Sequence, residues 1–171
     1  VYKRQLWMLS GSNELWPLTK HVKRMADYSD DGKTLAGAYG PRILAQIYYV
    51  VTSLVNDRFT RQSVLTTWDR NPQMSKDIAC TISMQFLIRQ DELIMSVTMR
   101  SSDIWLGIPY DLFSFSMVGN LIAILYNQKI VDDGLDYAPI KPGRLFITAG
   151  SRHLYDVNQT TAESVIHLAR K

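Results

Sequence analysis

Residues 80–100 read Cys-Thr-Ile-Ser-Met-Gln-Phe-Leu-Ile-Arg-Gln-Asp-Glu-Leu-Ile-Met-Ser-Val-Thr-Met-Arg, and this stretch decides the fold. Apolar and polar side chains alternate over 80–89 and again over 93–100, which is the two-residue period of a half-buried strand. The polar triplet 90–92 between the two runs has the composition of a turn. The sequence therefore predicts an antiparallel hairpin that brings Arg100 close to Cys80.

The sequence on both sides of the hairpin predicts alternating helices, strands and two long polar loops. Helices are indicated by apolar residues at helical spacing, and strands by short β-branched or aromatic runs. A capping box of Thr160 and Glu163 predicts the start of a last helix. In chain order, the elements predicted around the hairpin are a helix from Leu15, a loop over 28–41, a helix over 42–55, a strand over 63–68, a buried helix from Pro109 to Tyr126, a loop over 132–143, and strands over 145–148 and 153–155.

Composition bounds the class of protein. The 171 residues are 46% hydrophobic and 20% charged, which excludes a disordered chain and suits one domain with a real core. The formal net charge of +3 suits a protein that handles a small anion and gives no argument for a nucleic-acid partner. The sequence contains no unbroken apolar run of about 18 residues, so it predicts no membrane span. The single cysteine excludes an internal disulfide framework and a cysteine-rich metal site, and no metal ligation is expected.

Three groups of residues carry candidate chemistry, each beside a purely structural alternative. Cys80 is either a small buried side chain or a nucleophile whose pKa a nearby cation such as Arg100 lowers. The run from Arg100 to Asp103 suits an anion such as a phosphate, or is a solvated strand end. His153 and Tyr155 share one face of a predicted strand, where a hydrogen-bonded structural histidine is the more common case. On spacing alone, the chain is an α/β-type domain with an anion site.

Five ordered blocks of the sequence resemble the thymidylate synthase family. The Cys-x-x-x-x-Gln-Phe pattern of its active-site strand is matched by Cys80 to Phe86. The other matching blocks are Arg100-Ser101-Ser102-Asp103 with Gly107, Pro109 and Asp111; Gly150-Ser151-Arg152-His153-Leu154-Tyr155; Tyr39-Gly40; and Asn56-Asp57 with Arg61.

The resemblance implies an α+β fold: a mixed twisted sheet covered by helices, in one domain over residues 1–171, which dimerises through the other face of the sheet. It also implies transfer of a one-carbon unit from 5,10-methylenetetrahydrofolate, used as a co-substrate, to C5 of a pyrimidine deoxynucleotide. The Cys80 thiolate would add to C6 of the base and make C5 nucleophilic. We expect a homodimer in the cytoplasm, bacterial or phage-encoded, with no nucleic-acid or membrane partner.

The matched blocks give each site residue a role. Catalytic roles fall to Cys80, Tyr39 and Asp111. Arg61 is expected to reach the 5′-phosphate from the neighbouring subunit. The resemblance assigns further substrate contacts to Arg100, Ser101, Gln85, Ser151, His153 and Tyr155, and folate contacts to Asp103, Tyr28 and Gly107. Met25 stands where the family has a tryptophan of the folate pocket, and Gln62 where it has a second phosphate-binding arginine.

Departures from the family pattern favour its deoxycytidylate hydroxymethylase branch. Thr81 follows the cysteine, Met99 precedes Arg100, and Asp111 replaces the asparagine that reads the uracil edge. A protonated Asp111 matches the donor–acceptor edge of cytosine, whereas an ionised one would face uracil O4 with an unpaired charge. We therefore expect dCMP hydroxymethylation. Two alternative functions stay open: a thymidylate synthase acting on dUMP, and an inactive nucleotide-binding homologue. For Asp111 there is also a purely structural explanation, an acid in the first turn of a helix, where the helix dipole favours negative charge.

The two ends of the sequence carry one further expectation. Arg4 stands where the family has its catalytic glutamate, and residues 1–5 read like a translated sequencing adapter. We therefore expect residues 1–5 to be non-native and the domain to be an internal piece that is incomplete at both ends and not active by itself.

Overall fold

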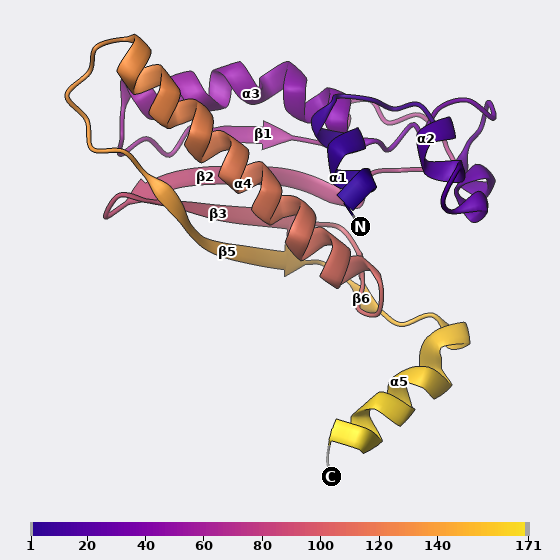
Figure 1. Cartoon of the computed structure of the whole chain (residues 1–171). Helices are drawn as coiled ribbons and strands as arrows, with labels where there is room; N and C mark the ends of the chain where they lie inside the picture. Colours follow the sequence, from indigo (N-terminus) through magenta and orange to yellow (C-terminus); the bar gives the residue numbers. More distant parts are fainter. Residues whose placement is uncertain (1, 170–171) are drawn as a thin grey trace.

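The computed structural model describes the backbone of residues 2–169 and the side chains of residues 4–169, so both ends of the expected domain lie outside it. Figure 1 shows how the elements follow one another along the chain. In chain order they are α1 (Tyr2–Leu9), α2 (Trp16–Thr19), the 3-10 helix η1 (Lys23–Tyr28), α3 (Tyr39–Asn56), β1 (Val64–Thr66), β2 (Thr81–Arg89), β3 (Glu92–Met99), β4 (Ser102–Asp103), α4 (Gly107–Asp132), β5 (Lys141–Ala149), β6 (Arg152–His153) and α5 (Asp156–Ala169).

The predicted hairpin is confirmed as β2 and β3, at the centre of a sheet with strand order β1-β2-β3-β5. Gln90 and Asp91 form its tight turn with φ of 52° and 58°, the left-handed pair that a two-residue hairpin turn requires. β5 lies parallel to β3 after the crossover through α4, so the sheet is mixed, as expected. The register pairs Thr81 with Met99, and the backbone N–H of Arg100 donates to the carbonyl of Cys80 at 2.8 Å.

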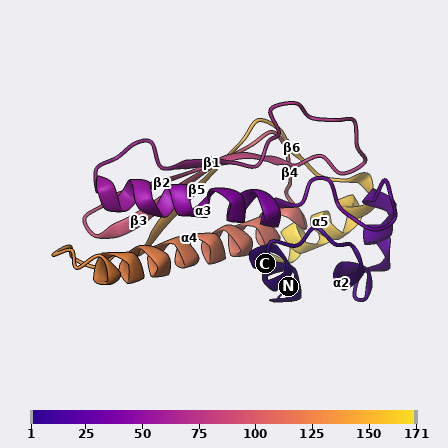
Figure 2. The same ribbon diagram turned by 90° about the horizontal axis from the view of Figure 1, so that it is seen from above.

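Both long helices cover the same face of the sheet (Figure 2). Alternate side chains of the hairpin point into this layer, including Met84, Phe86 and Val97, which are fully buried. They meet Phe115 and Ile122 of α4 in one core. Among residues 2–169 no helix covers the opposite face, which leaves half-buried or exposed side chains along three strands.

α4 is the spine of the helical layer. By length and composition alone it would also suit a bilayer span, although the sequence has no unbroken apolar run. Its side chains Phe115, Val118, Ile122 and Tyr126 are instead fully buried in the core of this domain. The prediction of a buried helix is thus confirmed for one face of α4, whereas other apolar side chains of this helix, such as Ile124, are exposed.

Some predicted boundaries are wrong for local reasons. α4 begins at Gly107 rather than Pro109, because the Asp103 carboxylate accepts the N–H groups of residues 105–107 and caps the helix earlier. α5 begins at Asp156, so Thr160 and Glu163 lie within the helix and form no capping box. The strand predicted over 153–155 is only the pair Arg152–His153, and Tyr155 follows it.

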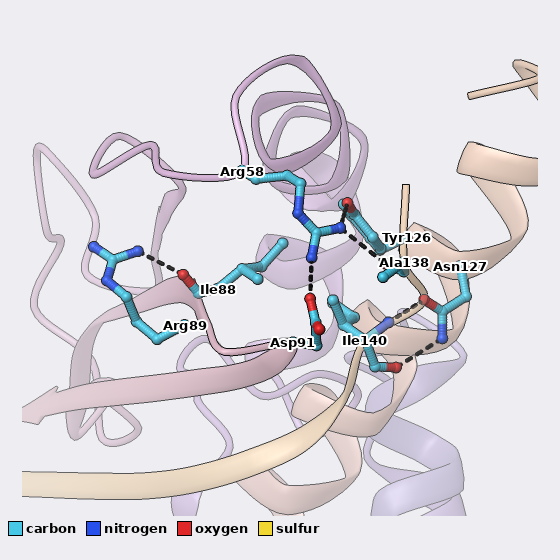
Figure 3. Close-up of polar contacts among 8 residues, drawn as sticks. All are labelled: Arg58, Ile88, Arg89, Asp91, Tyr126, Asn127, Ala138 and Ile140. Atoms are coloured by element: carbon cyan, nitrogen blue, oxygen red, sulfur yellow. Dashed lines mark hydrogen bonds and ion pairs between the residues drawn. The ribbon is translucent and has the colours of Figure 1, made fainter. Parts of the chain in front are cut away.

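Arg58 fastens together three segments at the far end of the sheet (Figure 3). Its guanidinium donates to the Tyr126 hydroxyl at 2.7 Å and to the Ala138 carbonyl at 2.8 Å, and pairs with the Asp91 carboxylate. The side chain is only 18% exposed, whereas that of Asp91 is 57% exposed. The buried end of this cluster therefore contributes more to stability than the exposed ion pair.

We predict that Arg58→Met lowers the free energy of unfolding by about 1–3 kcal/mol, because the Tyr126 hydroxyl and the Ala138 carbonyl lose their donor. Asp91→Asn should cost less than about 1 kcal/mol, since this partner is exposed. Urea unfolding followed by circular dichroism measures both values. Arg24→Met, at an exposed arginine of η1, is the matched control. Equal losses for Arg58→Met and Asp91→Asn would contradict this ranking.

Candidate functional site

Cys80, Tyr39 and Asp111 line one cavity of about 170 Å³. Three elements bring them there. Tyr39 opens α3, Cys80 directly precedes β2, and Asp111 lies on the second turn of α4. The structure thus assembles the three residues predicted to be catalytic, from positions spread over more than seventy residues of sequence.

The thiol of Cys80 is half-buried, and burial raises its pKa. Among the charged groups, Arg100 lowers the pKa of Cys80, as the sequence predicts, and Asp111 and Asp77 raise it. Burial outweighs the arginine in this ligand-free chain. The cysteine is therefore held mainly as the neutral thiol, which protects it from unspecific reaction.

Arg100 holds the segment that leads into the cysteine. Its Nε donates to the carbonyl of Ala79 and its Nη2 to the carbonyl of Ile78, both at 3.0 Å. The guanidinium also lies over the ring of Trp68, with Cζ 5.9 Å from the ring centroid. These contacts fix Cys80 in place and leave the remaining N–H groups of Arg100 available to an anion.

Tyr39 is bound to the strand on the other side of the cysteine. Its hydroxyl accepts the backbone N–H of Thr81 at 3.2 Å. Burial raises the pKa of Tyr39 to about 12, helped by the negative charges of Asp111 and Cys80 when these are ionised. At neutral pH the phenol is therefore a hydrogen-bond donor to whatever occupies the cavity.

Asp111 is 7% exposed, and burial raises its pKa to about 6. The positive charge of Arg4 opposes this shift, and the negative charge of Asp103 adds to it. An acid that merely stabilises the end of a helix at the surface would stay hydrated, whereas Asp111 is desolvated at the cavity. The neutral and the ionised carboxyl are both accessible near physiological pH.

A second group of predicted residues meets where β3 and β5 end side by side. The Ser101 Oγ lies 3.2 Å from Nδ1 of His153, and the rings of His153 and Tyr155 meet edge to face at 4.9 Å. The carbonyl of Ser151 accepts the N–H of Ser102. Because parallel strands deliver their C-terminal ends to one edge, residues 101 and 151–155 lie next to Arg100 without lining the cysteine cavity.

Other predicted residues lie away from the cavity. Arg61 is exposed on the loop after α3, and its carbonyl accepts the Gln85 amide N–H at 3.0 Å. Tyr28 is 42% exposed and does not line the cavity, whereas Met25 does. The Asp103 carboxylate caps α4 and so is occupied by backbone N–H groups. Gly107 packs tightly on it, since a Cβ there would lie 3.1 Å from the Cβ of Asp103.

Sequence reasoning missed Asp77 as a site residue. It lines the same cavity, and burial raises its pKa. An acid three residues before the candidate nucleophile was the available signal. Among the side chains of residues 4–169, no group of three or more His, Cys, Asp or Glu residues is placed to hold a metal ion.

Comparisons with known proteins give a consistent result. The family profile described as "Thymidylate synthase" matches residues 1–170. A deoxyuridylate hydroxymethyltransferase of Pseudomonas phage M6 is 36% identical over 128 residues, which are 69% of this chain and 36% of that protein. A protein of the same name from Delftia phage PhiW-14 is 32% identical over 117 residues, which are 59% of this chain and 33% of that protein.

Among solved structures, thymidylate synthase from T4 phage superposes with a TM-score of 0.69 and 19% sequence identity. The match covers 95% of this chain and 60% of that one, and it supports the predicted fold. The chain spans about a third of the length of the two curated relatives. Both relatives are named for deoxyuridylate, whereas Asp111 led the sequence analysis to favour deoxycytidylate.

We predict that two substitutions change the reactivity of Cys80 in opposite directions. Arg100→Gln should slow alkylation by iodoacetamide at pH 8, because the pKa of the thiol rises further when the cation is removed. Asp111→Asn should speed it, because a negative charge that raises this pKa is removed. Since Cys80 is the sole cysteine, intact-protein mass spectrometry follows the reaction directly. The exposed Arg70→Gln is the control, and equal rates in all proteins would contradict the prediction.

Proposed function

Because the chain belongs to the thymidylate synthase family, we propose that it supplies the cysteine nucleophile and much of the nucleotide site for one-carbon transfer to C5 of a pyrimidine deoxynucleotide. The observation that carries the proposal is the cavity that Cys80 shares with Tyr39 and Asp111. The leading reaction is hydroxymethylation of dUMP, which the names of the two phage relatives support.

The state of Asp111 supports dUMP as a substrate. A neutral carboxyl donates its O–H to uracil O4 and accepts N3–H through its carbonyl oxygen, the same pairing that an amide makes. With a pKa of about 6, about one molecule in ten carries the neutral form at pH 7, and a bound base desolvates the carboxyl further. The repulsion between Asp111 and uracil O4 therefore arises only when the carboxyl is ionised.

The first chemical step falls to Cys80. Its thiolate adds to C6 of the base, and the electron pair of the C5–C6 bond moves toward C5 and O4, which makes C5 nucleophilic. A bound phosphate next to Arg100 draws on the N–H groups that the carbonyls of Ile78 and Ala79 leave free. His153 and Tyr155, at the edge where β3 and β5 end, suit the sugar hydroxyl.

The cavity also offers a wall that suits a flat folate ring. Three apolar side chains line it, Leu18 of α2, Met25 of η1 and Leu35 of the loop before α3, and they belong to or pack against a small apolar cluster around Leu15. A bound methylenetetrahydrofolate supplies the one-carbon unit at the formaldehyde oxidation level. The residues of this wall exclude water and orient the ring, and Tyr39 provides a phenolic donor nearby.

The uncovered face of the sheet supports a homodimer. Its side chains are part apolar and part polar, and they lie on neighbouring strands: Ser83, Gln85, Leu87, Ile94, Ser96 and Phe146. Gln85 on this face holds the loop that carries the exposed Arg61. In a dimer through this face, Arg61 projects toward the neighbouring protomer, where it would reach the phosphate.

A second candidate, hydroxymethylation of dCMP, is favoured by one specific observation. The neutral Asp111 donates to cytosine N3 and accepts from the N4 amino group equally well. An ionised Asp111 additionally matches cytosine protonated at N3. Asp111 by itself thus permits both bases, and the groups around the base decide between them.

We predict that the whole protein releases tritium from the C5 position of labelled dUMP at least about tenfold faster, in kcat/KM, than from dCMP. Above about pH 6, kcat/KM for dUMP should stop rising with pH, because the loss of the neutral form of Asp111 offsets the gain of thiolate at Cys80. Asp111→Asn should keep dUMP activity, make it continue to rise with pH above 6, and lower dCMP activity at least tenfold. Mass spectrometry identifies a hydroxymethyl or a methyl product.

The contrary results are equally specific. A wild-type preference for dCMP that Asp111→Asn reverses would establish the second candidate and overturn the first. An unchanged preference after the substitution would remove Asp111 from base recognition. Cys80→Ser should abolish tritium release with either nucleotide, and residual turnover within about tenfold of wild type would contradict a covalent adduct at Cys80.

We further predict that Arg61 acts across the dimer. Arg61→Ala and Cys80→Ser subunits should each be nearly inactive alone. Mixed and allowed to exchange, they form heterodimers in which one site keeps both residues, so part of the activity returns. Mixing Arg70→Ala with wild type controls for exchange itself. Verified exchange without recovery would show that Arg61 serves its own protomer.

A further inference from the structure

Asp77 is a half-buried carboxyl at the cysteine cavity for which the proposed function gives no role. It lies on the loop between β1 and β2, three residues before Cys80, and lines the same cavity as Cys80 and Asp111. Its Oδ2 accepts the backbone N–H of Gly37 at 2.8 Å. Among the described residues, its Oδ1 accepts no hydrogen bond.

The position of this carboxyl is fixed from two sides. On one side, Gly37 allows a close approach: a Cβ at residue 37 would lie 2.9 Å from both the backbone oxygen and the Oδ1 of Asp77. On the other side, the N–H of Asp77 donates to the Ser75 Oγ at 3.0 Å, and the Ser75 hydroxyl donates to Asp30 at 2.5 Å. The chain thus holds Asp77 in place without using up its second oxygen.

We propose that Asp77 is the general base for the water that completes hydroxymethylation, an inference that rests on the function proposed above. After the one-carbon unit has been transferred, the base carries an exocyclic methylene at C5 and remains bonded to Cys80 at C6. A hydroxymethyl product requires water at this carbon, whereas a hydride would give a methyl group.

The water oxygen bonds to the methylene carbon, and one water proton passes to the Asp77 carboxylate. The electron pair of the exocyclic double bond moves into the ring, re-forms the C5–C6 double bond and expels the Cys80 thiolate. The products are the 5-hydroxymethyl nucleotide, the free thiolate and a protonated Asp77, which returns its proton to solvent.

Among the cavity-lining side chains that the structure describes, the other titratable groups suit this task less well. Tyr39 has a pKa of about 12 and its hydroxyl oxygen already accepts the N–H of Thr81, so it is a donor rather than a base. Asp111 is engaged with the edge of the base in the proposed complex. Burial raises the pKa of Asp77, which strengthens it as a proton acceptor, while the positive charges of Arg42 and Arg4 favour its ionised form and Asp30 opposes it.

The side of the cavity on which Asp77 lies agrees with this role. Its partner Gly37 lies two residues after Leu35, which belongs to the apolar wall that suits the folate, and directly before Ala38, which also lines the cavity. If the folate binds along this wall, the one-carbon unit arrives from this side. Departure of the folate would then open the methylene to the side of the cavity that carries Asp77.

The test separates addition of the cysteine from addition of water in the whole protein. With enzyme in excess over C5-tritiated nucleotide, Asp77→Asn should release tritium within a few fold of wild type, because Cys80 addition and one-carbon transfer are intact. Formation of the hydroxymethyl nucleotide should fall about a hundredfold or more. The Cys80 adduct should accumulate in intact-protein mass spectra, and added 2-mercaptoethanol should trap the methylene as a thioether.

Two comparisons make the result decisive. Asp77→Asn keeps an oxygen acceptor for the N–H of Gly37, so the local backbone contact is preserved. Asp69→Asn, at an exposed acid of the same loop, should leave the rates of tritium release and product formation unchanged. With Asp77→Ala, formate should restore product formation through the space left by the carboxylate. Parallel loss of tritium release and product, or an unchanged product rate, would overturn the role of Asp77. A wild type that forms only the methyl product, or no adduct, would instead overturn the proposed function.

Discussion

The register of the β2–β3 hairpin is the constraint on which the site depends. The turn at Gln90–Asp91 sets this register, and it closes at the other end with the hydrogen bond from Arg100 to Cys80. A slip of one residue would turn over one strand relative to the other, and in β2 this would expose Met84 and Phe86 and bury their polar neighbours. The core therefore enforces the same pairing that brings the guanidinium to the cysteine segment. Stability and site geometry have one origin here.

Burial acts on the whole cavity in one direction. It raises the pKa of Tyr39, Asp77, Cys80 and Asp111, so the ligand-free protein suppresses negative charge around the nucleophile. Arg100 is the nearby cation that opposes this for Cys80, and two of its N–H groups are bound to backbone carbonyls. The arrangement favours a thiol that becomes reactive once a substrate has reorganised the charges, rather than a permanently ionised cysteine.

Sequence reasoning recovered the architecture better than the details of the site. Alternation over residues 80–100 was sufficient for the hairpin, because burial on one face alone explains that period. The start of α4 was misplaced, since the Asp103 cap has a stronger effect than Pro109. Cys80, Tyr39 and Asp111 could be grouped only through family resemblance. Asp77 was missed because its position depends on Gly37, which is forty residues away in the chain and has no periodic signal.

The crossover through α4 has a consequence for how the chain assembles. β2 and β3 pair across two turn residues, whereas β5 joins β3 only after the whole of α4 has been made and packed. Until then, the N–H and C=O groups along the outer edge of β3 have no strand partner and form a template for any extended peptide. Ribosomal synthesis runs in the same order, so the nascent chain passes through an interval with an unprotected edge. In this interval the exposed edge is open to chaperones and to other nascent chains, whatever the stability of the finished fold.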